Sequence, residues 1–246
     1  MGSEAGLRMS LELSTEYQRV MFSELVREVT QRLGSSERVR LWSAGSGIDP
    51  TSLRLKKMFG NSVDVLLLDL SGRCVDINKQ LFARAKLEAE FETGDVFESH
   101  HRDEFDVVFN TGLLEHFDLR DQERLFGIFS ESLRVGGSYV TVTPSSGGKV
   151  YNFCRRRMMA RGTWAFGPEV PVTTFRGLDS HRLVLIDEHP VAPLDQITIF
   201  IPQAFPLLRL PSKALRRTGK LFSWIVDPIL MRSIGGYCLF DKFVKR

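Results

Sequence analysis

Four short runs of apolar residues, separated by segments long enough for helices, constrain the fold of this chain more than any other feature. The runs are residues 39–42, 63–68, 105–109 and 138–142. Strands that are apolar on both faces are typical of parallel sheets, because helices cover both faces of such sheets. Crossover helices are expected between these strands, at residues 50–59, 78–89 and 119–133. We therefore predict an α/β fold with a doubly wound, mostly parallel seven-stranded sheet and helices on both faces.

The ends of the chain depart from this alternation. Residues 11–33 carry apolar side chains at helical spacing, whereas residues after 143 lose the strand-helix rhythm. A short strand at 183–186 and a helix at 213–226 are expected in this later part. The predicted organisation is an N-terminal helical segment (1–36), a core of alternating strands and helices (37–150), a lid or insertion with a sixth strand (151–236), and a final edge strand of the same domain (237–246).

Composition excludes several classes of protein. The chain is 43% hydrophobic and 26% charged, and it has no charge-free stretch of the ~18 residues that a membrane helix needs. Its first residues lack the pattern of a secretory signal, so a cytoplasmic location is expected. The three cysteines are odd in number and widely spaced, which favours reduced thiols, and no metal ligands are predicted.

Charge is distributed unevenly along the chain. Residues 150–246 hold 15 Lys and Arg against 7 Asp and Glu, although the whole chain has a net charge of only +3. A basic surface attracts anionic acceptors or membranes, but such charges also occur on ordinary solvated faces. Peripheral membrane contact is one interpretation of the apolar segment 197–210 and the cations that follow it, Lys213, Arg216, Arg217 and Lys220.

A glycine-containing turn follows the first apolar run. Residues 43–47 read Ser-Ala-Gly-Ser-Gly, and Asp49 and Pro50 then mark the start of a helix. Glycines let the backbone approach a ligand closely, and the free amides of a helix start favour polar or anionic groups. A tight turn without any ligand explains the pattern equally well, so the neighbouring strands must decide between the two interpretations.

Carboxylates follow the next strands. Asp69 ends the second apolar run and lies 22 residues beyond Gly47, close to the roughly 20 residues typical of a ribose-binding acid. Asp95 follows the short strand expected at 89–93, where its carboxylate can accept a hydrogen bond from an exocyclic amine such as that of adenine. Both acids have structural alternatives, helix capping for Asp69 and a turn for Asp95. Together with the glycine turn, they indicate a nucleoside with free ribose hydroxyls.

These motifs carry a family resemblance. Residues 39–146 resemble the core of class I S-adenosylmethionine-dependent methyltransferases in the glycine turn, Asp69, Gly94-Asp95, the stretch 105–117 with its Glu-His pair, and the Gly-Gly step within 133–137. Two positions depart from the family pattern. Leu41 stands where an acid is usual, and Ser43 stands where the first glycine of the turn is usual.

The resemblance implies that residues 37–150 form a Rossmann-like cofactor-binding core and that residues 151–236 form the acceptor-binding lid or insertion. It also implies S-adenosylmethionine as the cofactor and assigns its contacts. The methionine part of the cofactor is expected to lie against Ser43, Ala44, Gly45, Ser46 and Gly47. The ribose and adenine are expected to contact Asp69, Leu70, Asp95 and Val96, and the methyl-donor end is expected to contact Asn110 and Thr111.

Candidates for catalysis and acceptor binding are less sharply indicated. His116 is the nearest candidate general base, because histidine is the side chain most often used for this role, and a structural hydrogen bond is the alternative role. The segment after the fifth strand should supply the acceptor pocket, since open α/β sheets bind ligands at that edge. Its candidate residues, which packing and solvation also explain, are Tyr151, Arg155, Trp164, Phe166 and Glu169.

The leading hypothesis is methyl transfer to oxygen or nitrogen of a small-molecule acceptor, such as a natural product, a glycan or a lipid-like compound. A catalytically inactive binding or partner subunit with the same fold is the first alternative, motivated by Leu41 and Ser43. A nucleic-acid methyltransferase is the second, although the chain lacks an Asn/Asp-Pro-Pro-Tyr/Phe motif and nucleic acid is therefore not the expected partner. A dehydrogenase is the remaining Rossmann-like alternative. The oligomeric state is not indicated.

Overall fold

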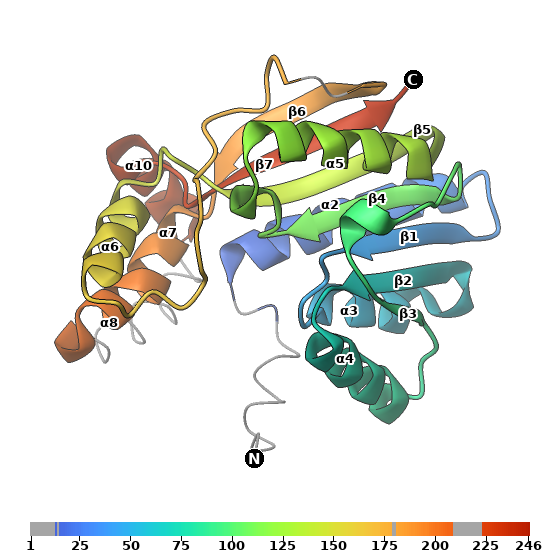
Figure 1. Cartoon of the computed structure of the whole chain (residues 1–246), viewed down its shortest axis with the longest axis horizontal. Helices are drawn as coiled ribbons and strands as arrows, with labels where there is room; N and C mark the ends of the chain where they lie inside the picture. The colour runs from blue at the N-terminus through green and yellow to red at the C-terminus, as the bar shows by residue number, and fades with distance from the viewer. Residues whose placement is uncertain (1–12, 14, 179–180, 209–222) are drawn as a thin grey trace.

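A single seven-stranded sheet with the order β3-β2-β1-β4-β5-β7-β6 organises the computed structural model, which describes residues 13, 15–178, 181–208 and 223–246 (Figure 1). The strands are β1 (Val39–Ala44), β2 (Val63–Asp69), β3 (Glu90–Thr93), β4 (Phe105–Thr111), β5 (Leu133–Pro144), β6 (Leu183–Val191) and β7 (Cys238–Lys245). The first five are parallel, and β7 runs antiparallel to both of its neighbours. The predicted mostly parallel, seven-stranded α/β fold is confirmed.

The prediction that the final strand lies at the edge of the sheet is wrong. Strand β7 lies between β5 and β6, and β6 is the edge strand. Burial explains this arrangement, because Phe240 and Phe243 of β7 pack into the cores on opposite faces of the sheet. Strand β6 is more exposed and contains Pro190, which has no N–H to donate and is therefore tolerated at an edge.

Helices cover both faces of the sheet. The helices are α2 (Glu16–Leu33), α3 (Pro50–Phe59), α4 (Gly72–Ala85), α5 (Leu119–Ser132), α6 (Lys149–Ala160), α7 (Pro193–Asp195), a π-helical turn (Gln196–Phe200), α8 (Ile201–Ala204) and α10 (Ser223–Ile234). Short 3-10 turns are η1 (Gly60–Ser62), η2 (Val96–Glu98), η3 (Leu114–His116) and η5 (Pro206–Leu208). Side chains of α2, α3 and α4 pack in one core, whereas those of α5 pack in the other.

A third, smaller core lies apart from the sheet. It joins Tyr151, Cys154 and Met158 of α6 to Phe200 and Ala204. In Figure 1 the helices α6, α7, α8 and α10 gather beyond the end of the sheet toward which β4 points. This is the insertion segment that was expected between the fifth and the last strand, and it approaches the edge where ligands bind in open α/β sheets.

Part of the sequence prediction lies outside the described residues. This holds for most of the helix expected at 213–226 and for the cations of the predicted membrane contact, Lys213, Arg216, Arg217 and Lys220. Among the helices in the described part of the chain, none combines the length and the apolar character needed to cross a membrane.

Candidate functional site

A cavity of about 470 Å³ lies at the carboxyl ends of β1, β2, β3 and β4. Parallel strands bring their carboxyl ends to one edge of the sheet, which is why residues distant in sequence meet there. Of the predicted cofactor residues, the cavity is lined by Ser43, Gly45, Ser46, Gly47, Asp69, Leu70, Asp95, Val96 and Thr111. His116 lines the same cavity, as do Tyr17 and Gln18 from the first turn of α2.

The turn after β1 depends on glycine. Gly45 and Gly47 have φ values of +62° and +53°, a backbone conformation that side chains with a Cβ rarely adopt. A Cβ atom at Gly45 would also lie 2.7 Å from a methyl carbon of Leu113. The backbone can therefore pass close to the loop after β4 and to any ligand in the cavity.

Asp69 links the first two strands at the cavity. One carboxylate oxygen accepts a hydrogen bond from the Gly47 amide at 2.6 Å, and the other accepts one from the Ser71 amide at 2.8 Å. A carboxylate offers about four lone-pair sites, so two acceptor positions remain for hydroxyl groups of a ligand. The side chain is thus held in place without being saturated.

Asp95 combines a structural role with a place in the cavity wall. Its carboxylate accepts the Phe97 amide at 3.0 Å and so caps the turn η2, the structural alternative considered from the sequence. The apolar side chains next to the two acids, Leu70 and Val96, also line the cavity. An adenine-sized ring would find apolar surface and hydrogen-bond acceptors together at this end.

Asp49 is a member of the cavity wall whose position the sequence indicated only as a helix cap. Its carboxylate accepts the Thr51 and Ser52 amides, which confirms the cap, and it also accepts the hydroxyl groups of Ser43 and Ser52. Burial raises the pKa of Asp49, whereas these hydrogen bonds oppose the shift. With all of its lone pairs engaged, Asp49 fixes the turn. Leu41 is fully buried in the core and contributes nothing polar.

Two predicted cofactor residues, Ala44 and Asn110, are not among the described residues that line the cavity. Ala44 is fully buried in the core that contains α5. Asn110 donates to the Tyr139 hydroxyl at 2.7 Å and accepts from the Thr141 hydroxyl at 2.7 Å. Its side chain joins β4 to β5 inside the protein.

The predicted acceptor residues lie in one neighbourhood of the insertion segment. Tyr151 donates its hydroxyl to a carboxylate oxygen of Glu169 at 2.7 Å, and Arg155 donates to the backbone carbonyl of Glu169 at 2.9 Å. The rings of Trp164 and Phe166 lie 5.1 Å apart, and Trp164 also contacts the ring of Tyr151. The predicted residues are therefore neighbours, although none of them lines the cofactor cavity itself.

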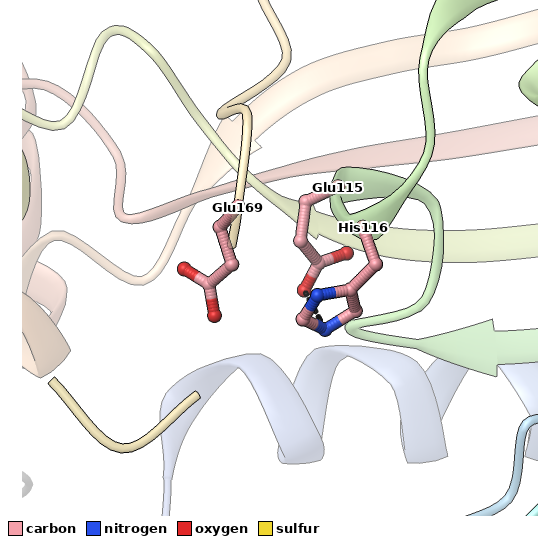
Figure 2. A group of neighbouring side chains, drawn as sticks. All are labelled: Glu115, His116 and Glu169. Carbon is pink, nitrogen blue, oxygen red and sulfur yellow. Dashed lines mark ion pairs between the residues drawn. The ribbon is translucent and has the colours of Figure 1, made fainter. Parts of the chain in front are cut away.

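His116 connects the two regions (Figure 2). It lines the cavity, its Nδ1 atom donates to the carbonyl of Pro168 at 3.0 Å, and its Nε2 atom lies 4.0 Å from a carboxylate oxygen of Glu115. Burial, together with the negative charge of Glu169, raises the pKa of Glu115 to about 8. Burial also raises the pKa of Glu169, although the hydrogen bond from Tyr151 opposes that shift. Sequence reasoning noted the Glu-His pair but missed the burial of its glutamate.

The first turn of α2 was also missed as part of the cavity wall. Its amides at Glu16 and Tyr17 donate to a carboxylate oxygen of Asp195, at 2.7 and 3.1 Å. Asp195 belongs to α7 in the insertion segment, so contacts between distant parts of the chain set the position of α2 beside the cavity. The helical spacing of residues 11–33 gave no signal for this contact.

Comparison with known proteins agrees with this geometry. Residues 43–137 match a family model described as a methyltransferase domain. A search of curated protein sequences found no significant match. A proposed sarcosine dimethylglycine methyltransferase from Galdieria sulphuraria aligns with 92% of this chain and 84% of its own, with a TM-score of 0.61 and 14% identity.

Two further solved structures illustrate the range of the fold. Geranyl diphosphate C-methyltransferase from Streptomyces coelicolor A3(2), in complex with Mg²⁺, geranyl diphosphate and S-adenosyl-L-homocysteine, has a TM-score of 0.59 at 17% identity and covers 91% of this chain and 79% of its own. The cyclase SpnF has a TM-score of 0.56 at 17% identity and covers 90% and 80%. Residues 43–137 thus match the methyltransferase-domain model, and the chain has the fold of class I methyltransferases.

Proposed function

We propose that this protein transfers a methyl group from S-adenosylmethionine to an oxygen or nitrogen atom of a small-molecule acceptor, such as a natural product, a glycan or a lipid-like compound. The observation that carries the proposal is the unsaturated carboxylate of Asp69, held by the Gly47 and Ser71 amides at the cavity. Its two remaining acceptor positions suit the paired hydroxyls of a ribose.

The residues present fit the rest of the cofactor as well. Gly45 and Gly47 line the cavity with backbone that carries no Cβ atom, which suits a close approach of the methionine part of the molecule. Bound S-adenosylmethionine supplies a methyl group on an activated sulfur, so the chain contributes mainly by holding the reactants in line and excluding water. Thr111, the last residue of β4, and His116 in the following turn line the cavity, and His116 contacts Pro168 of the insertion segment that carries the acceptor candidates.

The acceptor is proposed to lie against Tyr151, Arg155, Trp164, Phe166 and Glu169. These side chains combine aromatic rings with a carboxylate, a mixture that suits a small molecule with apolar and polar parts. Several proteins of similar fold are named as methyltransferases of small molecules, which supports an acceptor of that class. His116 lies between the acceptor region and the cavity, the place where a general base for an O–H or N–H acceptor would act.

Calorimetric titration with S-adenosylmethionine and S-adenosylhomocysteine tests the cofactor assignment. Saturable binding is expected, and Asp69→Ala should weaken it about 100-fold, because charge-assisted hydrogen bonds to the ribose are lost. Asp76→Ala is the matched control, since this exposed aspartate on α4 does not line the cavity. Absence of binding at millimolar cofactor would contradict the proposal.

A second candidate is a protein of this fold that does not transfer methyl groups. Leu41, buried where the family usually has an acid, removes one polar contact to the methionine part of the cofactor. The similar fold of the cyclase SpnF shows that a different activity can use this architecture. Transfer of an isotope-labelled methyl group to any acceptor in a screen of small molecules would decide against this candidate.

A further inference from the structure

Glu115, His116 and Glu169 bring their side chains together beside the cofactor cavity (Figure 2). One oxygen of each carboxylate and one imidazole nitrogen all lie within 4.8 Å of one another. Glu115 and His116 belong to the turn η3 after β4, whereas Glu169 belongs to the segment that follows α6. We propose that these three residues bind a divalent metal ion.

Glu115 provides the strongest indication of a missing cation. Its side chain is only 2% exposed, and among the described residues its Oε2 atom has no hydrogen-bond partner. A buried carboxylate oxygen without a hydrogen-bond partner is disfavoured, and buried acids are normally paired with cations or coordinate metals. The nearest basic group is His116 Nε2, which lies 4.0 Å from the other carboxylate oxygen of Glu115.

The orientation of His116 suits a metal ligand. A carbonyl oxygen can only accept, so the 3.0 Å contact with Pro168 requires the hydrogen of His116 to reside on Nδ1. The lone pair is then on Nε2, the atom that faces Glu115. Histidine ligands of metals usually donate their other ring N–H to a carbonyl or carboxylate in this way.

Glu169 is oriented by neighbours from α6. The hydroxyl of Tyr151 donates to Oε2 of Glu169, and Arg155 holds the backbone carbonyl of the same residue. Within the described chain, Oε1 of Glu169 has no hydrogen-bond partner and remains available for coordination. Hydrogen bonds of this kind from surrounding residues orient carboxylate ligands in metal sites.

The ligand set indicates the class of ion. One imidazole and two carboxylates suit Zn²⁺ or Mn²⁺, and the two negative charges balance a divalent cation. Ligand atoms around such ions lie at most about 4.2 Å apart, twice a typical metal–ligand distance. The observed limit of 4.8 Å therefore requires only a small inward rotation of the side chains.

The position of the site suggests what a bound ion would do. His116 also lines the cofactor cavity, so an acceptor hydroxyl coordinated by the ion would lie beside the methyl-donor end of the cofactor. The ion would lower the pKa of that hydroxyl group. In that arrangement His116 acts as a ligand and not as a general base. This role rests on the proposed function, whereas metal binding itself does not depend on it.

Titration of the full chain with Mn²⁺, followed by electron paramagnetic resonance and without any cofactor, tests the proposal directly. One Mn²⁺ per chain is expected, with Zn²⁺ as a competitor. Glu115→Gln, His116→Ala and Glu169→Gln should each weaken binding at least about 10-fold. Glu98→Gln and His100→Ala, two exposed residues of the same types outside the cluster, should leave it unchanged.

Circular dichroism and thermal melting of each variant establish that loss of binding does not reflect unfolding. Tyr151→Phe gives a second readout, because removal of the hydrogen bond to Glu169 should weaken Mn²⁺ binding less than Glu169→Gln does. The proposal would be overturned if the wild type showed no saturable binding of Mn²⁺ or Zn²⁺. It would also be overturned if all three ligand variants bound Mn²⁺ as tightly as the wild type. Since the cofactor is left out, failure here would not reflect on the cofactor assignment.

Discussion

Asp49 holds the turn after β1 through its hydrogen bonds with backbone amides and with the hydroxyls of Ser43 and Ser52. Asp49→Ala would leave these buried donors without an acceptor. We expect the free energy of unfolding to fall by about 3 kcal/mol, the sum of a lost helix cap and unsatisfied buried groups. Urea denaturation measures the change, with Asp76→Ala as an exposed control. An unchanged midpoint would show that other contacts fix the turn.

Single residues also show how far the sequence could predict the site. The placement of Asp69 and Asp95 followed from the rule that parallel strands end at one edge, and both line the cavity. The orientation of Asn110 could not be predicted from that rule, because it depends on the pairing of Asn110 with Thr141 across β4 and β5. The burial of Glu115 depends on a segment some fifty residues later, as the contact between His116 and Pro168 illustrates.

At the scale of elements, the pairing of β6 with β7 places Glu188 opposite Asp241. Burial and the charge of Glu188 raise the pKa of Asp241 from 3.8 to about 9. The folded protein therefore holds a proton that the unfolded chain releases above pH ~4, so this residue lowers stability progressively as the pH rises from about 4 to about 9. Asp241→Asn should remove this pH-dependent loss of stability, because asparagine does not ionise. The substitution should therefore raise the melting temperature at pH 9 more than at pH 5. Equal gains at both pH values would contradict this reasoning.

The same strands mark the limit of pattern-based prediction for elements. Apolar runs identified the parallel strands, but the neighbours of β7 are set by pairing, which periodicity does not encode. A glycine pair such as Gly136-Gly137 is typical of the end of a helix, because glycine tolerates the left-handed backbone there. It lies within β5 instead, where the pairing with β4 shifts between Leu133 and Ser138 and Gly136 adopts a φ of +77°.

At the scale of the whole molecule, Asp195 couples the insertion segment to α2 and thereby to the cavity. It accepts the amides of Glu16 and Tyr17, and Tyr17 lines the cavity. Asp195→Ala should lower both the melting temperature and the affinity for S-adenosylmethionine, the latter about 3- to 10-fold, because two amides in the first turn of α2 lose their acceptor. Asp187→Ala, a half-exposed residue of β6, is the control. A lower melting temperature with unchanged affinity would show that the position of α2 does not affect cofactor binding.

The pairing of Pro144 with Cys238 has a consequence for diversification of the protein. Residues 145–237 add the edge strand β6 to the sheet, and the two ends of this segment lie at directly opposed positions on adjacent strands, about 5 Å apart. The parts of this segment before and after β6 can therefore vary in length, since the entropy of closing a loop grows only slowly with its length. Segments of different length and sequence can be grafted there to change the proposed acceptor while the cavity is kept, provided that each graft retains β6 and a carboxylate in place of Asp195 that accepts the α2 amides.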